Sequence, residues 1–594
     1  MTVHHEMTYT LEDVARVAAG EVAELAKDTK AMLDDRRRAI EQFVAETEAP
    51  SYGFNRGFGH NVDQAVPLDR CPELQENLIR SHSAGVGEFA PKEVVRAAMF
   101  IRAISLARGH SGVRPVVVET LLAMLNRDVT PCVPVFGSVG ASGDLVPLSH
   151  IALTMLEGEG GLAFFGGDVL PAEDAMRAAG IPRIRLASKE GLALNNGVTF
   201  STAYGVLSCL RVETLLKTAA VATAMSLQVL LGSDTPFRAD LHALRPHPGA
   251  VKMAQWISRL IHGSPIVEAH RPYDIDGEVQ DPYSLRCSAQ VLGACHELVS
   301  AARTALQVEV NSVTDNPLLL PVPQGDPRKG AWVGQVVDIV SGGHFHGMPV
   351  AVHLYGLLQA MAIMASLSNT RCARFVDGRR NRGLNEDLKW RDEWQEDGVQ
   401  RDAVSSGMMV PEYVSAALTN AILGAAMPSH LFSMPTDAGQ EDHVSMCATL
   451  AARLWDTLPR LAELLAIELA FATQAAAIRR RADHIPSKVN LTQDELSRLS
   501  HLKDRLTEEA RRLLNSRYER PLHDVLCEFT VRHPIAPEER LLSPACEAVR
   551  KEVEAIFPTV TRDRVLSFEL RELATWVSGG GALRAAEEAM GAPL

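Results

Sequence analysis

The stretch "STAYGVLSCLRVETLLKTAAVATAMSLQVLLG" (residues 201–232) decides the fold that we expect. It contains no proline, and apolar residues occur along its whole length. A helix that is apolar on every side is typical of a buried core position. Its length exceeds that of an ordinary globular helix, which favours an elongated bundle of long helices over compact globules.

Similar helical runs follow along the chain, at residues 293–312 ("GACHELVSAARTALQVEVNS") and 348–377. The most apolar run is "LAELLAIELAFATQAAAI" (461–478), which contains Glu463 and Glu468. Two carboxylates in so short a span indicate a buried bundle helix and not a membrane helix. The expected fold class is therefore all-α, with a single small hairpin at residues 160–172.

Composition excludes several function classes. The 594 residues carry a net charge of −14, which argues against nucleic acid as a partner because phosphate binding needs a basic surface. Hydrophobic residues make up 46% and aromatic residues only 5%, a mixture that favours helices packed on helices. Nine cysteines occur singly and no signal sequence opens the chain, which predicts a cytoplasmic protein with reduced thiols.

A glycine-rich stretch, "GSVGASGDLVPLSH" (137–150), precedes an apolar helical run. Glycine-rich turns often bind phosphates, but this one lacks lysine and matches neither G-x-x-x-x-G-K-[ST] nor G-x-G-x-x-G. A nucleotide site is therefore not expected here. A densely charged stretch, residues 377–402, is poorly periodic and is interpreted as a solvated loop, with a lid or an oligomer contact as the alternatives.

Several unusual motifs occur together and in a fixed order. They are "SYGFNRGFG", "NLIRSHSAGVG", "GSVGASGDLVPLSH", "EGLALNNG", "VQDPYSLRCSAQVLGACHE", "EVNSVTDNPL", "SGGHFHG" and "GQEDHVSM". In this order they resemble the aromatic amino acid ammonia-lyase and aminomutase family, and most closely its histidine ammonia-lyases. The resemblance runs from about residue 50 to about residue 480.

The resemblance implies a cofactor made from the chain itself. In this family Ala-Ser-Gly, here Ala141, Ser142 and Gly143, cyclises to 4-methylidene-imidazol-5-one (MIO) with loss of two waters. The residue types suit that chemistry: Gly143 lets its nitrogen fold back onto the Ala141 carbonyl, and Ser142 supplies the hydroxyl that leaves. The product is an electrophile that turns a substrate amine into a better leaving group.

The resemblance also implies roles for other residues. Tyr52 is the expected general base for the β-proton, and Arg286 is the expected clamp on the substrate carboxylate, because its planar fork matches a carboxylate. His82 and Glu441 match the pair that recognises the side chain in histidine ammonia-lyases. The remaining expected contacts, of which Tyr283 counts as catalytic, are Asn196, Gln280, Tyr283, Phe345 and Gln440.

Three positions depart from the family pattern. Arg56 stands where threonine is usual, and Val198 replaces a residue with a hydroxyl. Asp437 adds a carboxylate four positions before Glu441, one turn away if this segment is helical. Arg56 and Asp437 are thus further candidates for the site, and both weaken any prediction of the substrate from sequence.

Simpler structural roles compete for some of these residues. A lone histidine such as His82 more often caps a helix than binds a ligand. His344 and His346 form an H-x-H pair, but no carboxylate or cysteine pattern accompanies it, so no metal is expected. Asp315 and Asn316 in "TDNP" suit a cap or a turn as well as a substrate contact.

Further expectations follow from the resemblance. The architecture is that of the fumarase/aspartase-like superfamily, with a cofactor-bearing region 1–205, a long-helix bundle 206–480 and a C-terminal helical region 481–594. The partners are a small amino-acid substrate and three further copies of the chain, in a homotetramer with shared active sites. The reaction is elimination of ammonia from L-histidine to give urocanate. The alternatives are a phenylalanine or tyrosine lyase, a 2,3-aminomutase, and a non-catalytic relative.

Overall fold

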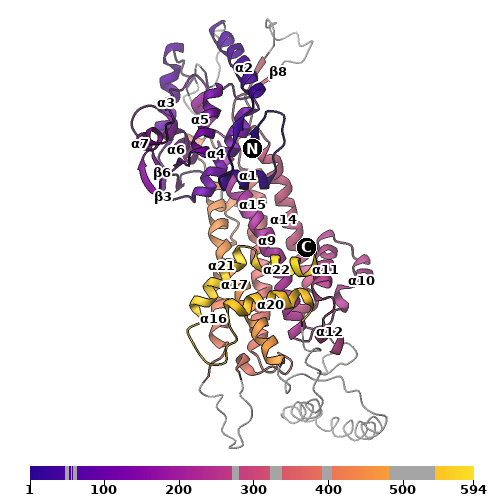
Figure 1. The fold of residues 1–594 in the computed structure, drawn as a ribbon. Helices are drawn as coiled ribbons and strands as arrows, with labels where there is room; N and C mark the ends of the chain where they lie inside the picture. Colours follow the sequence, from indigo (N-terminus) through magenta and orange to yellow (C-terminus); the bar gives the residue numbers. More distant parts are fainter. Residues whose placement is uncertain are drawn as a thin grey trace, which may run out of the picture. The chain divides into compact units, whose positions relative to one another are not determined.

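The computed structural model of the protein describes residues 1–46, 53–54, 56–57, 63–270, 280–321, 337–390, 405–480 and 542–594. Helices dominate these residues, and the strands among them are short (Figure 1). The predicted all-α class with a helical bundle is confirmed.

The chain forms two compact units. Unit 1 contains Met1–Val212, Leu298–Leu358 and Ala425–Thr457, and unit 2 contains Glu213–Glu297, Gln359–Gly424 and Leu458–Leu594. The predicted division into regions 1–205, 206–480 and 481–594 stays a prediction. The helices that contribute residues to both units are α9 (Thr199–Val229), α14 (Ser288–Val310), α15 (Met348–Val376), α16 (Met409–Ala425) and α17 (Cys447–Arg479).

Unit 1 begins with shorter helices. Helix α1 starts at a capping box, in which Thr10 and Asp13 each bind the other's backbone N–H, and it buries Leu11, Val14 and Val17. The helices that lie wholly in unit 1 are α1 (Leu11–Ala18), α2 (Lys27–Glu46), α3 (Cys71–His82), α4 (Lys92–Ala107), α5 (Pro115–Asn126), α6 (Leu145–Met155), α7 (Ala172–Ala178) and α8 (Glu190–Asn195).

Four small sheets accompany these helices in the part of the chain that the structure describes. The predicted hairpin is confirmed, since β6 (Leu162–Phe165) and β7 (Asp168–Pro171) pair antiparallel, with β4 (Thr130–Pro131) on the other side of β6. The remaining pairs are β1 (Thr2–Val3) with β2 (Glu24–Leu25), β3 (Val86–Phe89) with β5 (Pro134–Phe136), and β8 (Leu318–Pro321) with β9 (Val337–Val340).

The long helices pack closely within each unit. In unit 1 a Cβ on Gly205 of α9 would lie 2.7 Å from Leu306 of α14 and 2.8 Å from Leu354 of α15, so these helices approach at a glycine. In unit 2 the rings of Phe375 on α15 and Phe471 on α17 stack with centroids 5.8 Å apart. The sequence predicted such a core because these helices carry few polar residues.

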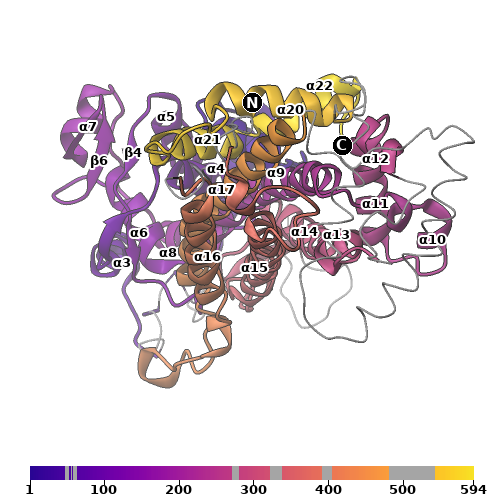
Figure 2. The same cartoon turned by 90° about the horizontal axis from the view of Figure 1, so that it is seen from below.

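Unit 2 also contains helices that lie wholly within it. In both views α20 and α22, drawn in yellow, lie side by side (Figures 1 and 2). The helices are α10 (Ala239–Ala243), α11 (Pro248–Ile261), α12 (Pro265–His270), α13 (Tyr283–Arg286), α20 (Pro544–Ile556), α21 (Ser567–Ser578) and α22 (Gly581–Met590). A helical C-terminal part was predicted, and residues 481–541 of it lie outside the described residues.

Among the described helices, α15 and α17 have the length and hydropathy of membrane spans. Their apolar windows are 61% and 89% buried inside the protein, respectively. Burial by other helices gives the apolar side chains of these windows their partners, as expected for core helices. The prediction that residues 461–478 form a buried bundle helix is confirmed.

The charged stretch 377–402 is not simply a solvated loop. Residues 377–390 are described, and within them Asn381, Leu384, Asn385 and Leu388 are buried. The side chain of Arg382 is only 9% exposed and pairs with Asp281. The prediction was wrong here because charge density along a sequence does not reveal a distant, buried partner; residues 391–402 lie outside the described residues.

Candidate active site

The Ala141-Ser142-Gly143 loop lies between β5 and α6 and is joined to the segment after α8. Gly197 N donates to Ser142 O at 3.2 Å, and Asp144 N donates to Gly197 O at 2.7 Å. Gly143 has φ +82°, and a Cβ there would lie 2.2 Å from the Gly197 oxygen. Only glycine fits at this position, for both conformational and steric reasons.

The Ser142 carbonyl accepts a second hydrogen bond, from Asn196 Nδ2 at 2.7 Å. Asn196 is 4% exposed and follows the last residue of α8. The structure therefore brings Asn196 to the loop that the sequence singled out. Among the described residues, no acceptor takes the Gly143 N–H, and Ala141 is 3% exposed.

Asp144 fixes the end of the loop through its hydrogen bonds, a role that the sequence did not reveal. It is fully buried and accepts hydrogen bonds from Ser201 N at 2.7 Å, from Ser201 Oγ at 2.8 Å and from Ser138 Oγ at 3.1 Å. Burial raises the pKa of Asp144, and these hydrogen bonds oppose that rise. A charged residue directly after a small-residue loop was the available signal.

Glu441 lies directly against the loop. Ser142 Oγ donates to Glu441 Oε1 at 2.6 Å, and Thr436 Oγ1 donates to Glu441 Oε2 at 2.6 Å. Both carboxylate oxygens are thus held, one by the loop and one by a neighbouring hydroxyl.

Asp437 and Gln440 lie in a tight turn before Glu441. Thr436 N donates to Glu441 O at 3.0 Å, and Asp437 and Ala438 have φ of +49° and +53°. The segment is therefore no α-helix, so the condition under which Asp437 would lie one helical turn from Glu441 is not met. Gln440 is exposed, and its N–H donates to Asp437 O at 3.0 Å.

His82 ends helix α3 and is half-buried. Its Nδ1 lies 3.0 Å from Ser81 Oγ. Burial lowers the pKa of His82, although the nearby carboxylates of Glu441 and Asp437 oppose that effect. A lowered pKa favours the neutral ring, which has one N–H donor and one acceptor nitrogen.

The segment that carries Phe345 is also tied to the loop. Gly347 N donates to Gly140 O at 3.0 Å, and Ser445 Oγ donates to the same oxygen at 2.8 Å. Phe345 is half-buried in the turn before Gly347, whereas His344 is exposed. The Asn316 side chain accepts from Gly342 N at 2.7 Å and donates to Ser341 Oγ at 3.2 Å, so it ties its segment to the one that leads to Phe345.

Unit 2 holds the predicted carboxylate clamp, on α13. Arg286 Nε donates to Asp281 O at 2.8 Å, and one of its Nη atoms donates to Gln280 Oε1 at 2.6 Å. The guanidinium lies 4.6 Å from the ring centroid of Tyr283, which is 71% exposed. The structure therefore groups Gln280, Tyr283 and Arg286, as the sequence motif implied.

Two predicted positions lie at the edge of what is described. Tyr52 lies outside the described residues. Arg56 is half-buried, and its Nη1 donates to Asp63 O at 3.0 Å. Val198, the other departure from the family pattern, is buried and accepts a backbone hydrogen bond from Thr202.

Two buried cations near α8 also escaped the sequence analysis. Lys189 Nζ lies 2.6 Å from Asp315 Oδ2, and neither side chain is exposed. Arg102 is buried, its Nη1 donates to Ala193 O at 3.2 Å, and burial lowers its pKa to about 10. Asp315 thus has a structural role, because it anchors the helix that leads to Asn196.

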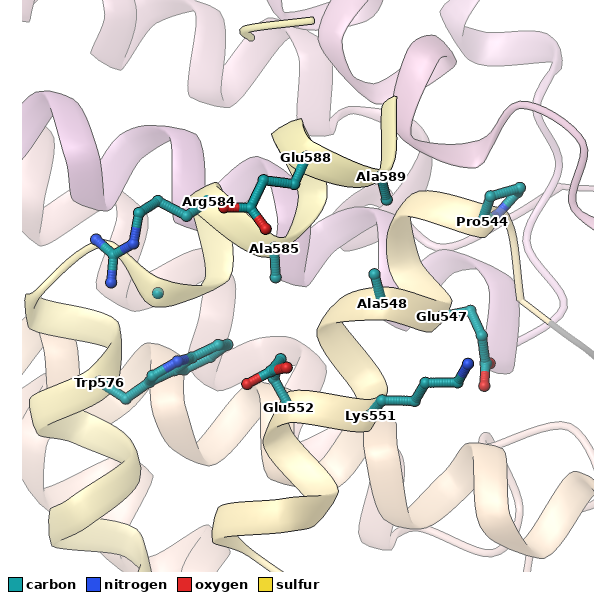
Figure 3. A pocket seen from close by; sticks show the side chains of 11 residues that line it. Pro544, Glu547, Ala548, Lys551, Glu552, Trp576, Arg584, Ala585, Glu588 and Ala589 are labelled. Atoms are coloured by element: carbon teal, nitrogen blue, oxygen red, sulfur yellow. The ribbon is translucent and has the colours of Figure 1, made fainter. Parts of the chain in front are cut away.

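Two other features carry no predicted site residue. His4, His5 and Asp28 have ligand atoms within 4.8 Å of one another, but the two imidazole rings stack with centroids 4.5 Å apart. A cavity of about 720 Å³ lies among α20, α21 and α22 (Figure 3). Its charged lining mixes both signs, with Glu547, Lys551, Glu552, Arg584 and Glu588, and Trp576 lies at one end of it.

Comparisons with known proteins agree with the sequence motifs. The family model for aromatic amino acid lyases matches residues 9–500, so α20, α21 and α22 lie beyond it. Histidine ammonia-lyase of Gloeobacter violaceus is 41% identical over 469 residues, which is 79% of this chain and 86% of that protein. Histidine ammonia-lyase of Bradyrhizobium diazoefficiens is 41% identical over 472 residues, 80% of this chain and 86% of that protein.

Solved structures give the same picture. The tyrosine aminomutase from Streptomyces globisporus has a TM-score of 0.80 and 29% identity, covering 99% of this chain and 98% of that chain. Histidine ammonia-lyase from Trypanosoma cruzi has a TM-score of 0.76 and 28% identity, covering 99% of this chain and 95% of that chain.

Proposed function

The chain belongs to the aromatic amino acid lyase family, and from that premise we propose that it eliminates ammonia from L-histidine to give urocanate. The observation that carries the choice of histidine is Glu441, whose Oε1 lies 2.6 Å from Ser142 Oγ. A carboxylate beside the reacting position accepts an imidazole N–H, whereas a phenyl ring offers it no such donor. The relatives that are histidine ammonia-lyases support the same substrate.

Ala141, Ser142 and Gly143 are the residues proposed to form the MIO group. They fit it, because Gly143 adopts a left-handed conformation, its amide has no acceptor among the described residues, and Ala141 adds little bulk. The group supplies an electrophile for the substrate amine, which ordinary side chains do not provide. Asn196 and Gly197 hold the Ser142 carbonyl with two N–H donors and so fix the loop.

The other side chains bind and orient the substrate in this proposal. Arg286 binds the carboxylate with the N–H groups that Asp281 and Gln280 do not use. Glu441 accepts one imidazole N–H, and neutral His82 hydrogen-bonds or stacks on the same ring. Tyr52 remains the proposed base for the β-proton.

A second candidate is an aminomutase acting on tyrosine. The likeness to the Streptomyces globisporus tyrosine aminomutase supports it. The same residues serve both reactions, and a mutase differs by retaining the product long enough to return ammonia to the β-carbon. Asp437 is the position that a different substrate would use, since its carboxylate lies near enough to His82 to affect that ring's pKa.

A cytoplasmic homotetramer with shared active sites is the proposed assembly. Apolar side chains exposed on α16 suit a subunit interface, because soluble proteins rarely leave such patches uncovered. These side chains are Val410, Tyr413, Val414 and Leu423. Sedimentation equilibrium of the full chain tests the assembly.

A panel of amino acids tests the proposed function. Histidine, tyrosine and phenylalanine are incubated with the protein, the unsaturated acid is followed by ultraviolet absorbance, and β-amino acids are separated by chromatography. The proposal expects urocanate and ammonia in equal amounts from histidine, with no β-histidine. A β-amino acid as the main product supports the mutase instead.

A further inference from the structure

Arg382 is a cation that the family motifs do not include, yet it is almost fully buried. Its Nη2 lies 2.9 Å from Asp281 Oδ1, with the two side chains 9% and 5% exposed. Its Nη1 also donates to Leu231 O. Burying a charge is costly unless it is paired and hydrogen-bonded, so this pair holds its two chain segments together.

Asp281 connects that ion pair to Arg286. Its second carboxylate oxygen accepts from Ser233 N at 2.6 Å, and its backbone oxygen accepts from Arg286 Nε at 2.8 Å. Arg382 and Ser233 thus hold the side chain of Asp281, while its backbone oxygen orients the guanidinium of Arg286. Any shift of Asp281 moves the acceptor that fixes the direction of Arg286.

A second buried pair holds the body of α13. Arg371 pairs with Glu468 at 2.5 Å, and neither side chain is more than 1% exposed. Arg371 Nη1 also donates to Ser284 O at 3.3 Å. Arg371 and Arg382 thus hold α13 and its approach at two different points, and the loss of either pair lets the helix shift.

We infer that Arg382 is a positioning residue: its ion pair with Asp281 keeps that carboxylate from turning to Arg286, so that the guanidinium keeps its direction and its affinity for the substrate carboxylate. The inference rests on the proposed function in taking Arg286 as the clamp. Without Arg382 the buried Asp281 carboxylate has lost its cation, and Arg286 is already bound to the same residue. The orphaned carboxylate then competes with the substrate carboxylate for Arg286.

The test is a mutant cycle on the full-length enzyme. R382Q is expected to raise KM for the amino acid about tenfold, as for a weakened contact to a charged group, with kcat changed less than about threefold. The double variant D281N/R382Q removes the orphaned charge, so it is expected to recover most of the lost affinity. R380Q is the matched control, because Arg380 lies in the same segment with its side chain 72% exposed.

A second readout needs no substrate. Cys287 follows Arg286 at the end of α13 and is half-buried, whereas the other cysteines that the structure describes are buried. Iodoacetamide labelling of Cys287, quantified by peptide mass spectrometry, is expected to be several-fold faster in R382Q than in wild type or R380Q. Labelling reports the position of α13 even if histidine proves not to be the substrate, so the two proposals fail separately.

The inference is overturned if R382Q leaves both KM and Cys287 labelling unchanged. It is equally overturned if D281N/R382Q is as impaired as R382Q, because a purely structural loss is not repaired by removing the second charge. If the wild type turns over an amino acid other than histidine, the same KM comparison is made with that amino acid.

Discussion

The hydroxyl of Ser142 donates a 2.6 Å hydrogen bond to Glu441, although 299 positions separate the two residues in the chain. The contact joins the loop after β5 to the turn before α17. It places a carboxylate beside the one residue whose hydroxyl the proposed cofactor chemistry must lose. The choice of substrate and the chemistry of the loop therefore meet at this pair.

Glu441 is expected to select histidine. In E441Q the imidazole N–H keeps a hydrogen-bond acceptor, but that acceptor is no longer charged. The transition state for histidine is therefore expected to lose about 1.5–3 kcal/mol of stabilisation relative to that for phenylalanine, measured as the ratio of their kcat/KM values. D437S is the companion variant, assayed with histidine, tyrosine and phenylalanine. A histidine-specific loss in D437S, with none in E441Q, would assign the recognition to Asp437 instead.

Gly143 is expected to tolerate no side chain. In G143A the new Cβ meets the Gly197 oxygen, while G167A has a similar φ of +97° with nothing within 4 Å. Both variants carry the cost of about 1–2 kcal/mol for a left-handed alanine, but only G143A must also break the contact between the two loops. Activity is expected to vanish in G143A and persist in G167A, as measured by steady-state assays. Equal activities would show that the loops need not touch.

Arg286 is expected to require its planar fork. R286K keeps the charge but cannot bind Asp281, Gln280 and a substrate carboxylate at the same time. The transition state should lose about 1–3 kcal/mol of stabilisation, measured as a lower kcat/KM. The exposed Arg245 gives a control substitution, R245K, with no expected effect. An unchanged kcat/KM in R286K would remove Arg286 from the site.

Glu309 is expected to make stability depend on pH. Burial raises the pKa of Glu309 to about 7 from 4.5, with Asp144 adding to the rise. The pKa of Glu309 is higher in the folded protein than in the unfolded chain. The free energy of unfolding therefore falls as the pH rises from about 4.5 to about 7, and the contribution of Glu309 is least favourable above about pH 7.

The variant E309Q cannot ionise at this position, so it does not show this fall in the free energy of unfolding. It should therefore be more stable than wild type at about pH 8, by about 1–3 kcal/mol, and should show little difference at about pH 4.5. Thermal unfolding midpoints at the two pH values measure this, with the exposed E88Q as control. A gain of the same size at both pH values would mean that packing, and not ionisation, separates the variants.

The sequence predicts the helices and the hairpin well, because both follow from local patterns. The run 201–232 is apolar on all sides and forms most of α9, and the glycine pair between β6 and β7 marks a tight turn. The turn at Asp437 could not be predicted in the same way. Its two residues with positive φ lie inside the local pairing of Thr436 with Glu441, and Glu441 is itself bound by Ser142, which is a tertiary contact.

The burial of charged side chains could not be predicted from the sequence either. Arg382 lies among many charged neighbours in the sequence, and only the fold brings Asp281 to it. Asp144 and Lys189 likewise take partners from other elements, Ser201 and Asp315. A sequence shows that a residue is ionisable, but its burial depends on what the rest of the chain packs around it.

Formation of the electrophile by Ala141, Ser142 and Gly143 can be measured as the mass of the intact protein. Wild type is expected to be lighter than its sequence mass by two waters. S142A, which has no hydroxyl to lose, is expected not to show this deficit and to lose activity by orders of magnitude with native helical content. A wild-type mass equal to the sequence mass, or near-normal turnover by S142A, would show that these three residues do not form the electrophile.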